Sequence, residues 1–194
     1  MSSLPKPVVV VGPEATSSLW QSVFDPGATD LRLMERVLAL NPAVIANTPV
    51  TIYSTKGDGT PQYFPGTTSS QGFSTPPLHA AVMSENFPLV KLLCGPGPGR
   101  PYAELNALDR RRHMTALTAA MQVPIQSEDL SQTGFDIAWY LLGRRADINA
   151  GIPSAWKYAS RHAAADGNIR VLYEQMQPLH RGSQDGAGAG HVES

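Results

Sequence analysis

Residues 74–93 constrain the fold of this chain more than any other stretch, because they indicate two short helices separated by a turn. Apolar residues at helical spacing predict the first helix, and Ser74 or Thr75 is placed to cap its start. Asn86 and Pro88 end that helix and begin a second one, since Asn tolerates a left-handed turn and Pro suits a first helical position. Helices this short cannot bury their apolar faces alone, so the stretch predicts further copies of itself.

Two further copies follow at intervals of about 39 residues. Leu78, Leu117 and Trp156 occupy the same position in the three copies. Two matching five-residue segments, Ala-Glu-Leu-Asn-Ala at 103–107 and Ala-Asp-Ile-Asn-Ala at 146–150, each follow the end of a Leu-Leu helix. The chain is therefore predicted to repeat one helix-turn-helix unit.

In this order the pieces resemble the ankyrin-repeat family, whose pattern is T-P-L-H-x-A, a Gly turn, a V-V-x-L-L helix and an A-D-V-N-A loop. The resemblance covers residues 28–177. It implies a mainly α-helical solenoid of about one partial and three full helix-turn-helix repeats, with β-hairpin or loop fingers between them. The chain departs from the pattern at residues 75–79, which hold an extra Pro, and at Glu85, which replaces the turn Gly. Its repeat also exceeds the usual length of about 33 residues, so each copy must hold an insertion.

The segments flanking the repeats predict an N-terminal region and a tail. Within residues 1–27, a Val run at 8–11 indicates an extended segment that lies on the body or pairs with another strand. Residues 17–24 predict a short helix that caps the first hydrophobic edge of the stack. Residues 31–40 form a well-patterned helix, which resembles the second helix of a degenerate terminal repeat. Residues 178–194 are predicted to be a flexible tail, rich in Gly and Ala near its end.

A longer insertion at residues 48–72 predicts a β-hairpin that projects from the stack. Residues 51–53 and 62–64 are β-prone, and residues 56–59 between them are rich in turn formers. The aromatic side chains of the hairpin either pack on the stack or contact a partner. As candidate partner-binding residues they are Tyr53, Tyr63 and Phe64.

Residues 109–113 are the only dense charged run, and the resemblance places them at the tip of a finger. A solvated loop is one interpretation. Arginine is also enriched at interfaces and binds carboxylates or phosphates with two hydrogen bonds, so the run is a candidate site for an acidic partner surface or ligand. Its candidate residues are Arg110, Arg111, Arg112 and His113.

The remaining reactive side chains predict no catalytic residue. The resemblance implies that His79 is a structural hydrogen-bonding residue that joins neighbouring repeats, and Cys94 lies on an apolar helix, where buried thiols are common. His162 and Asp166 are four residues apart and can share one helix face, and with Tyr158 they are candidate pocket residues. A third metal ligand is missing there, so we expect neither a metal nor another cofactor.

Composition and charge limit the classes of function that this chain can have. With 194 residues and 42% hydrophobic content, the chain fits one repeat array with tails. Its net charge of −1 argues against a general nucleic-acid or anionic-membrane surface, since both would leave an excess of Lys and Arg. A single cysteine excludes an internal disulfide, and the Val run at 8–11 is too short to span a bilayer. We therefore expect a cytoplasmic or nuclear protein.

The function expected from these features is a binding module whose fingers and concave groove bind another protein, with no chemistry of its own. The alternative is that the insertions and aromatic residues convert the groove into a small-molecule pocket, which would make the protein an enzyme or a ligand carrier. An apolar cavity with convergent polar groups would favour this alternative.

Overall fold

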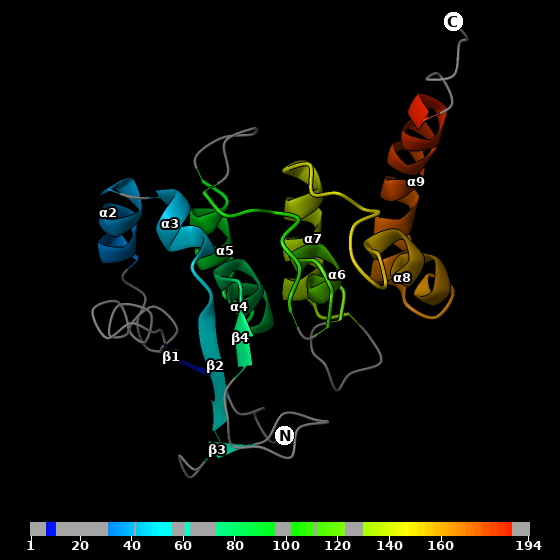
Figure 1. The fold of residues 1–194 in the computed structure, drawn as a ribbon. Helices are drawn as coiled ribbons and strands as arrows, with labels where there is room; N and C mark the ends of the chain where they lie inside the picture. The colour runs from blue at the N-terminus through cyan, green and yellow to red at the C-terminus, as the bar shows by residue number, and fades with distance from the viewer. Residues whose placement is uncertain are drawn as a thin grey trace, which may run out of the picture.

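The structure is a computed structural model that describes residues 7–10, 31–40, 42–55, 61–62, 73–95, 102–110, 112–122 and 130–187. This part of the chain is mainly helical (Figure 1). Four features predicted from the sequence lie outside it: the helix at 17–24, Arg111, Tyr63 and Phe64.

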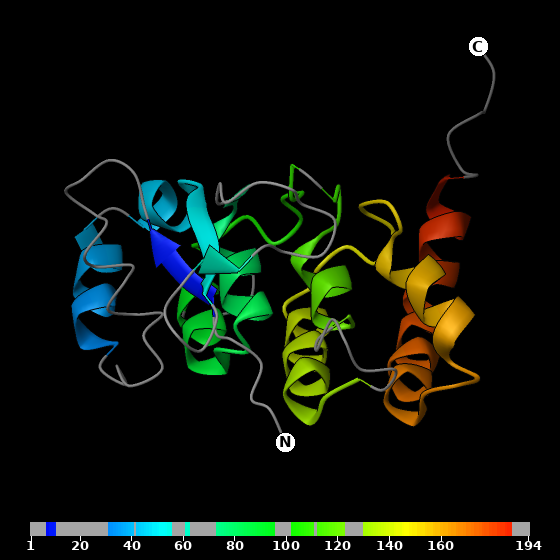
Figure 2. The same ribbon diagram turned by 90° about the horizontal axis from the view of Figure 1, so that it is seen from below.

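The described residues contain three consecutive helix pairs, as the sequence pattern predicts. They are α4 (Pro77–Met83) with α5 (Phe87–Leu93), α6 (Ala116–Ala120) with α7 (Gln132–Gly143), and α8 (Ala155–His162) with α9 (Gly167–Ala187). The first helix of each pair begins about 39 residues after the one before. The pairs lie side by side in chain order (Figures 1 and 2), so α6 packs between α4 and α8, and α7 between α5 and α9.

Two further helices precede the pairs. The helix predicted at 31–40 is present as α2 (Arg32–Leu40), and its Met34 and Leu38 are fully buried. The sequence analysis did not predict α3 (Pro42–Asn47), which packs against both α2 and α4. The first residue of α3 is a proline, which is tolerated in the first turn of a helix. The proline therefore allows a new helix to begin directly after α2 ends.

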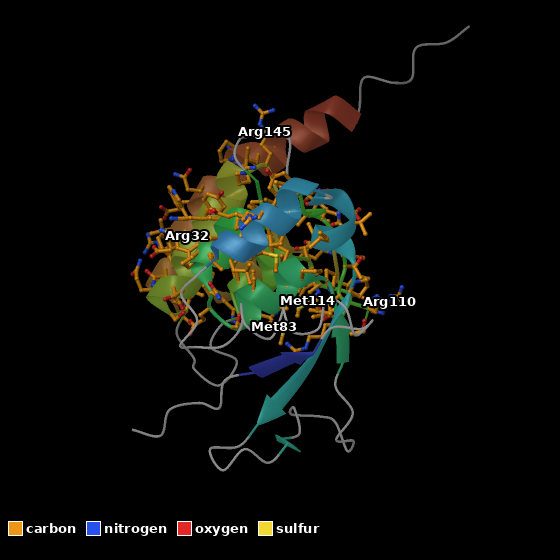
Figure 3. All side chains as sticks on the ribbon, turned by 90° about the vertical axis from the view of Figure 1, so that its left-hand side faces the viewer. Arg32, Met83, Arg110, Met114 and Arg145 are labelled. Atoms are coloured by element: carbon orange, nitrogen blue, oxygen red, sulfur yellow. The ribbon has the colours of Figure 1, made fainter. Side chains whose placement is uncertain are left out.

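Short antiparallel strands lie to one side of the helices (Figures 1 and 3). They are β1 (Pro7–Val10), β2 (Val50–Thr55), β3 (Pro61–Gln62) and β4 (Phe73–Thr75). β2 pairs with all three others: with β1 from residue 51 to 54, with β4 from 50 to 52, and with β3 at 54 and 55. The β2–β3 pair lies within the segment where the sequence predicts a hairpin. β4 leads directly into α4 and joins the strands to the helix pairs.

The helix starts show which side chains act as caps. The hydroxyls of Thr115 and Ser154 cap α6 and α8 as N-cap residues, each accepting an N–H bond at 3.3 Å. The prediction that Ser74 or Thr75 caps α4 is wrong, because Pro76 occupies the N-cap position and makes no side-chain cap. The extra proline places Thr75 one residue too early, and its hydroxyl donates to Asp109 Oδ2 instead, at 3.2 Å.

Helix α9 continues to Ala187, past residue 177, where the tail was expected to begin. The later turns of α9 are held by the Trp156 ring of α8. This ring stacks on Tyr173 and on His180, with ring centroids 4.7 and 4.3 Å apart. His180 Nδ1 also lies 3.0 Å from Asn149 Oδ1, in the loop before α8.

Gly134 allows the start of α7 to approach the end of α6. A Cβ atom at this position would lie 2.8 Å from the Ala120 carbonyl oxygen and 2.8 Å from Leu130 Cδ1. Real Cβ atoms essentially never come this close to such atoms, so a larger residue would push the two helices apart.

We expect Gly134→Ala to lower the free energy of unfolding by about 1–2 kcal/mol, because overpacking outweighs the gain in helix propensity. Urea denaturation followed by circular dichroism measures the change. The control is Gly143→Ala near the end of the same helix, where an added Cβ would meet nothing within 4 Å. That substitution should raise the free energy of unfolding by up to about 1 kcal/mol. Equal effects of the two changes would contradict the close approach.

Candidate partner-binding surface

A buried hydrogen bond recurs between consecutive helix pairs. His79 Nε2 donates to the Met114 carbonyl oxygen at 2.9 Å. About 39 residues later, Thr118 Oγ1 donates to the Pro153 carbonyl oxygen at 3.4 Å. The same position in the third copy is Lys157, which is exposed on the last helix pair of the described residues. The link therefore joins each inner helix to the loop that precedes the next one.

Asparagine side chains join the loops in a second series. Asn47 Oδ1 accepts the Glu104 N–H at 2.7 Å, and Asn106 Oδ1 accepts the Asp147 N–H at 2.8 Å. Each asparagine thus binds the acidic position of the following loop. The sequence analysis missed Asn47, because the loop after α3 lacks the Ala-x-x-Asn-Ala pattern that identified Asn106 and Asn149.

A third set of bonds joins the turns between paired helices. Ser131 Oγ, at the start of α7, donates to Glu85 Oε1 in the α4–α5 turn at 2.6 Å. The Leu130 N–H donates to Asp166 Oδ2 in the α8–α9 turn, and Asn168 Nδ2 donates to the Leu130 carbonyl at 3.3 Å. Glu85, in the α4–α5 turn, has a φ of 53°, the left-handed value that Gly favours.

All three candidate pocket residues have structural contacts. The Tyr158 and His162 rings stack with centroids 4.4 Å apart. Asp166 Oδ1 accepts the N–H groups of Asn168 and Ile169, in addition to the Leu130 bond above, so this carboxylate stabilises the start of α9. Burial raises the pKa of the Tyr158 hydroxyl, and the nearby Asp166 raises it further. These contacts account for the conformations of all three side chains without a ligand.

The charged run at 109–113 divides into a buried acid and exposed bases. Asp109 is 2% exposed; its Oδ1 accepts the Arg112 N–H at 2.9 Å, and its carbonyl accepts the His113 N–H at 2.8 Å. The Thr75 hydroxyl binds its other carboxylate oxygen. Arg110 points away from the helices (Figure 3), His113 is exposed, and Arg112 is half-buried. The outward side chains of this loop are therefore basic.

The next loop packs against this basic turn and carries an exposed apolar residue. The Ile152 N–H donates to the His113 carbonyl at 2.8 Å, and Gly151 precedes it with φ of 86°. A Cβ at Gly151 would lie 3.0 Å from that carbonyl oxygen, so both space and conformation require glycine. Ile152 is 78% exposed. An isolated Ile in a loop gave no sequence signal, although its spacing of about 39 residues from His113 could have identified it.

Among the predicted hairpin aromatics, the backbone of Tyr53 lies in β2, opposite Val8 of β1. Its side chain lies outside the described part of the structure, as do Tyr63 and Phe64.

Cys94 is buried at the end of α5. Burial raises the pKa of its thiol to about 12, although the Arg144 guanidinium acts in the opposite direction. Arg144 Nη2 donates to the Cys94 carbonyl oxygen. At neutral pH the residue is therefore a protonated apolar side chain and not a nucleophile.

We expect Cys94 to react with a water-soluble disulfide reagent at least about a hundredfold more slowly in the native protein than in denaturant, because the thiolate is the reactive form. Absorbance of the released thiol measures the rate at neutral pH. A suitable comparison is Ser160→Cys in a Cys94→Ala background, since Ser160 is exposed on α8. Similar native rates for the two cysteines would show that Cys94 is accessible.

His79 is neutral in the folded protein. Burial lowers the pKa of its imidazole, while the bond to Met114 and the nearby Asp109 act in the opposite direction. The Met114 carbonyl can only accept, so Nε2 carries the proton. Nδ1 is buried and has no hydrogen-bond partner among the described residues. A second proton would place a charge in an apolar site.

Lowering the pH should destabilise the fold through His79. The unfolded chain takes up a proton below about pH 6.5 and the folded chain does so only at lower pH, so stability is lost as pH falls through this window. The slope from this residue is at most about 1.4 kcal/mol per pH unit. His79→Thr copies the residue at the equivalent position 118, and its stability should depend less on pH between 7 and 5. Parallel pH curves for the two proteins in urea denaturation would contradict this.

The described residues contain no group of three or more His, Cys, Asp or Glu side chains that could hold a metal ion. None of the helices in the described ranges is long and apolar enough to cross a membrane. Comparisons of the chain with protein-family models, with curated proteins and with solved structures give no match.

Proposed function

We propose that this chain is a divergent ankyrin-like solenoid that binds another protein through its finger loops and has no chemistry of its own. The finger loops are residues 102–114 and 144–154, which connect each helix pair to the next. The observation that carries the proposal is the basic turn at 109–113, in which Asp109 is buried while Arg110 and His113 are exposed.

Repetition of the same bonds supports the solenoid. The donors at 79 and 118 and the acceptors at 114 and 153 share the spacing of about 39 residues found in the helix starts. The asparagine bonds from 47 and 106 also point from one loop to the next. Bonds of this kind, made only between neighbouring units, are those expected of an array in which each repeat contacts its neighbours.

Burial favours the finger loops over the concave groove as the binding surface. All residues of α6 are buried, as are residues 77–82 of α4. Only α8 among these inner helices presents several exposed side chains, including Lys157 and Arg161. The finger loops, by contrast, expose both charged and apolar side chains along the array.

The pocket alternative has less support. The carboxylate of Asp166 is used by backbone N–H groups, and the Cys94 thiol stays protonated at neutral pH. The single cysteine also fits a reducing compartment, so we place the proposed module in the cytoplasm or nucleus.

Replacing Arg110, Arg111 and Arg112 with Ala should reduce capture of the partner from an extract of the native source by more than about tenfold, since truncated interface arginines commonly cost about 2 kcal/mol. Quantitative mass spectrometry of the captured proteins measures the loss. Arg36→Ala is the control, because Arg36 is exposed on α2, outside the finger loops. Capture that is unchanged by the triple substitution, with the melting temperature also unchanged, would reject the arginine site.

A further inference from the structure

The two finger loops are joined at both ends, so the residues between these ends form one surface. At one end the Asn106 side chain accepts the Asp147 N–H at 2.8 Å. At the other end the His113 carbonyl accepts the Ile152 N–H at 2.8 Å. We call the outer side of these two loops the finger surface, and its residues used below are Leu108, Arg110, Arg112, His113 and Ile152.

The finger surface carries both apolar and basic side chains. Ile152 is 78% exposed and Leu108 is 43% exposed. A single exposed apolar residue is normal on a soluble protein. Here, however, the Ile152 N–H is bonded to the His113 carbonyl in the basic turn. The backbone conformation just before Ile152 requires glycine at position 151. The backbone that carries the exposed Ile152 side chain is therefore fixed against the basic turn.

The sign of the exposed charge differs between the two ends of the finger surface. The bases at 110, 112 and 113 lie at the end bound to Ile152, and their acidic neighbour Asp109 is buried. The exposed acids Glu104 and Asp147 lie at the opposite end, beside Asn106. A bound segment therefore meets positive charge together with apolar surface at one end and negative charge at the other.

We infer that the finger surface binds an extended acidic segment of a partner protein in which an apolar side chain stands among the carboxylates. The apolar side chain packs on Ile152, and the flanking carboxylates bind Arg110 and Arg112, since guanidinium groups pair with carboxylates through two parallel hydrogen bonds. This inference rests on the proposed protein-binding function and specifies the chemistry of the partner.

A nucleic acid fits the same surface less well. Phosphate backbones bind extended basic tracts, whereas the basic side chains here occupy one turn and exposed acids lie at the far end of the same loops. The formal net charge of the chain, −1, also provides no general attraction for a polyanion. A peptide carboxylate needs only the local arginines.

The test is a selection of random peptides displayed on phage against the immobilised full-length chain, followed by fluorescence anisotropy with the selected peptides. Selected peptides should carry Asp or Glu beside Leu, Ile, Val or an aromatic residue. Arg110→Glu and Ile152→Ser should each weaken their binding by at least about tenfold. The matched controls, Arg36→Glu and Leu179→Ser, should leave it within about twofold, because Arg36 on α2 and Leu179 on α9 are also exposed but lie outside the finger loops. Higher salt should weaken binding to the parent chain.

Other results overturn the inference in distinguishable ways. Selected peptides that lack the acidic and apolar pairing, or that bind Arg110→Glu normally, would leave protein binding intact and remove the finger surface as the site. Binding of single-stranded RNA that Arg110→Glu abolishes would assign the surface to nucleic acid instead. A dimer in sedimentation that Ile152→Ser converts to monomer would show that Ile152 contacts a second copy of this chain. Failure of both the peptide selection and the partner capture would reject the proposed function as well.

Discussion

The buried carbonyl oxygen of Met114 is the acceptor on which the arrangement of neighbouring helix pairs depends most. It accepts the His79 Nε2–H and the Asp109 N–H, both at 2.9 Å, so one atom joins the inner helix α4 to the turn of the following loop. Leaving a buried carbonyl unsatisfied costs about 1–3 kcal/mol, which is a large part of the stability of a small domain. Burial of the apolar helix faces provides most of the stabilising free energy, but apolar contacts still allow one helix to slide slightly against another. The directional bonds at 79 and 118 fix how far each pair is offset from the next.

The same network couples the fold to the proposed binding surface. The Asp109 carboxylate is held inward by the Thr75 hydroxyl and by the Arg112 N–H, while Arg110 and His113 of the same turn are exposed. Thr75 and His79 therefore bind the turn that carries Arg110, although neither is itself exposed. Under the proposed function, a substitution in this network would change partner binding through the conformation of the loop, even with every arginine in place. Residues that stabilise the array and residues that present its surface are thus physically connected.

The sequence predicted the helix pairs because their information is local and repeated: apolar spacing, caps and turn residues recur about every 39 positions. It did not predict features set by contacts between distant residues. Thr75 failed as a cap because the adjacent Pro76 took that position, and its hydroxyl then found Asp109, 34 residues away. The run at 109–113 was identified as a charged loop, but its division into a buried acid and outward bases depends on that distant hydroxyl. Asn47 and Ile152 were missed for a related reason, since each acts through a bond to the neighbouring loop and belongs to no motif.

Positions 79, 118 and 157, one in the first helix of each described pair, differ in what their side chains contact. His79 and Thr118 both donate to a carbonyl of the next loop, although one donor is an imidazole and the other a hydroxyl. The position therefore requires a hydrogen-bond donor that reaches this carbonyl, and not one residue type. In the third copy it is the exposed Lys157, whose charge could not be buried beneath a further helix pair without a partner. Beside it, Trp156 packs on Tyr173 and His180 of α9. The long helix α9 thus covers the Trp156 side of α8 in the last described helix pair.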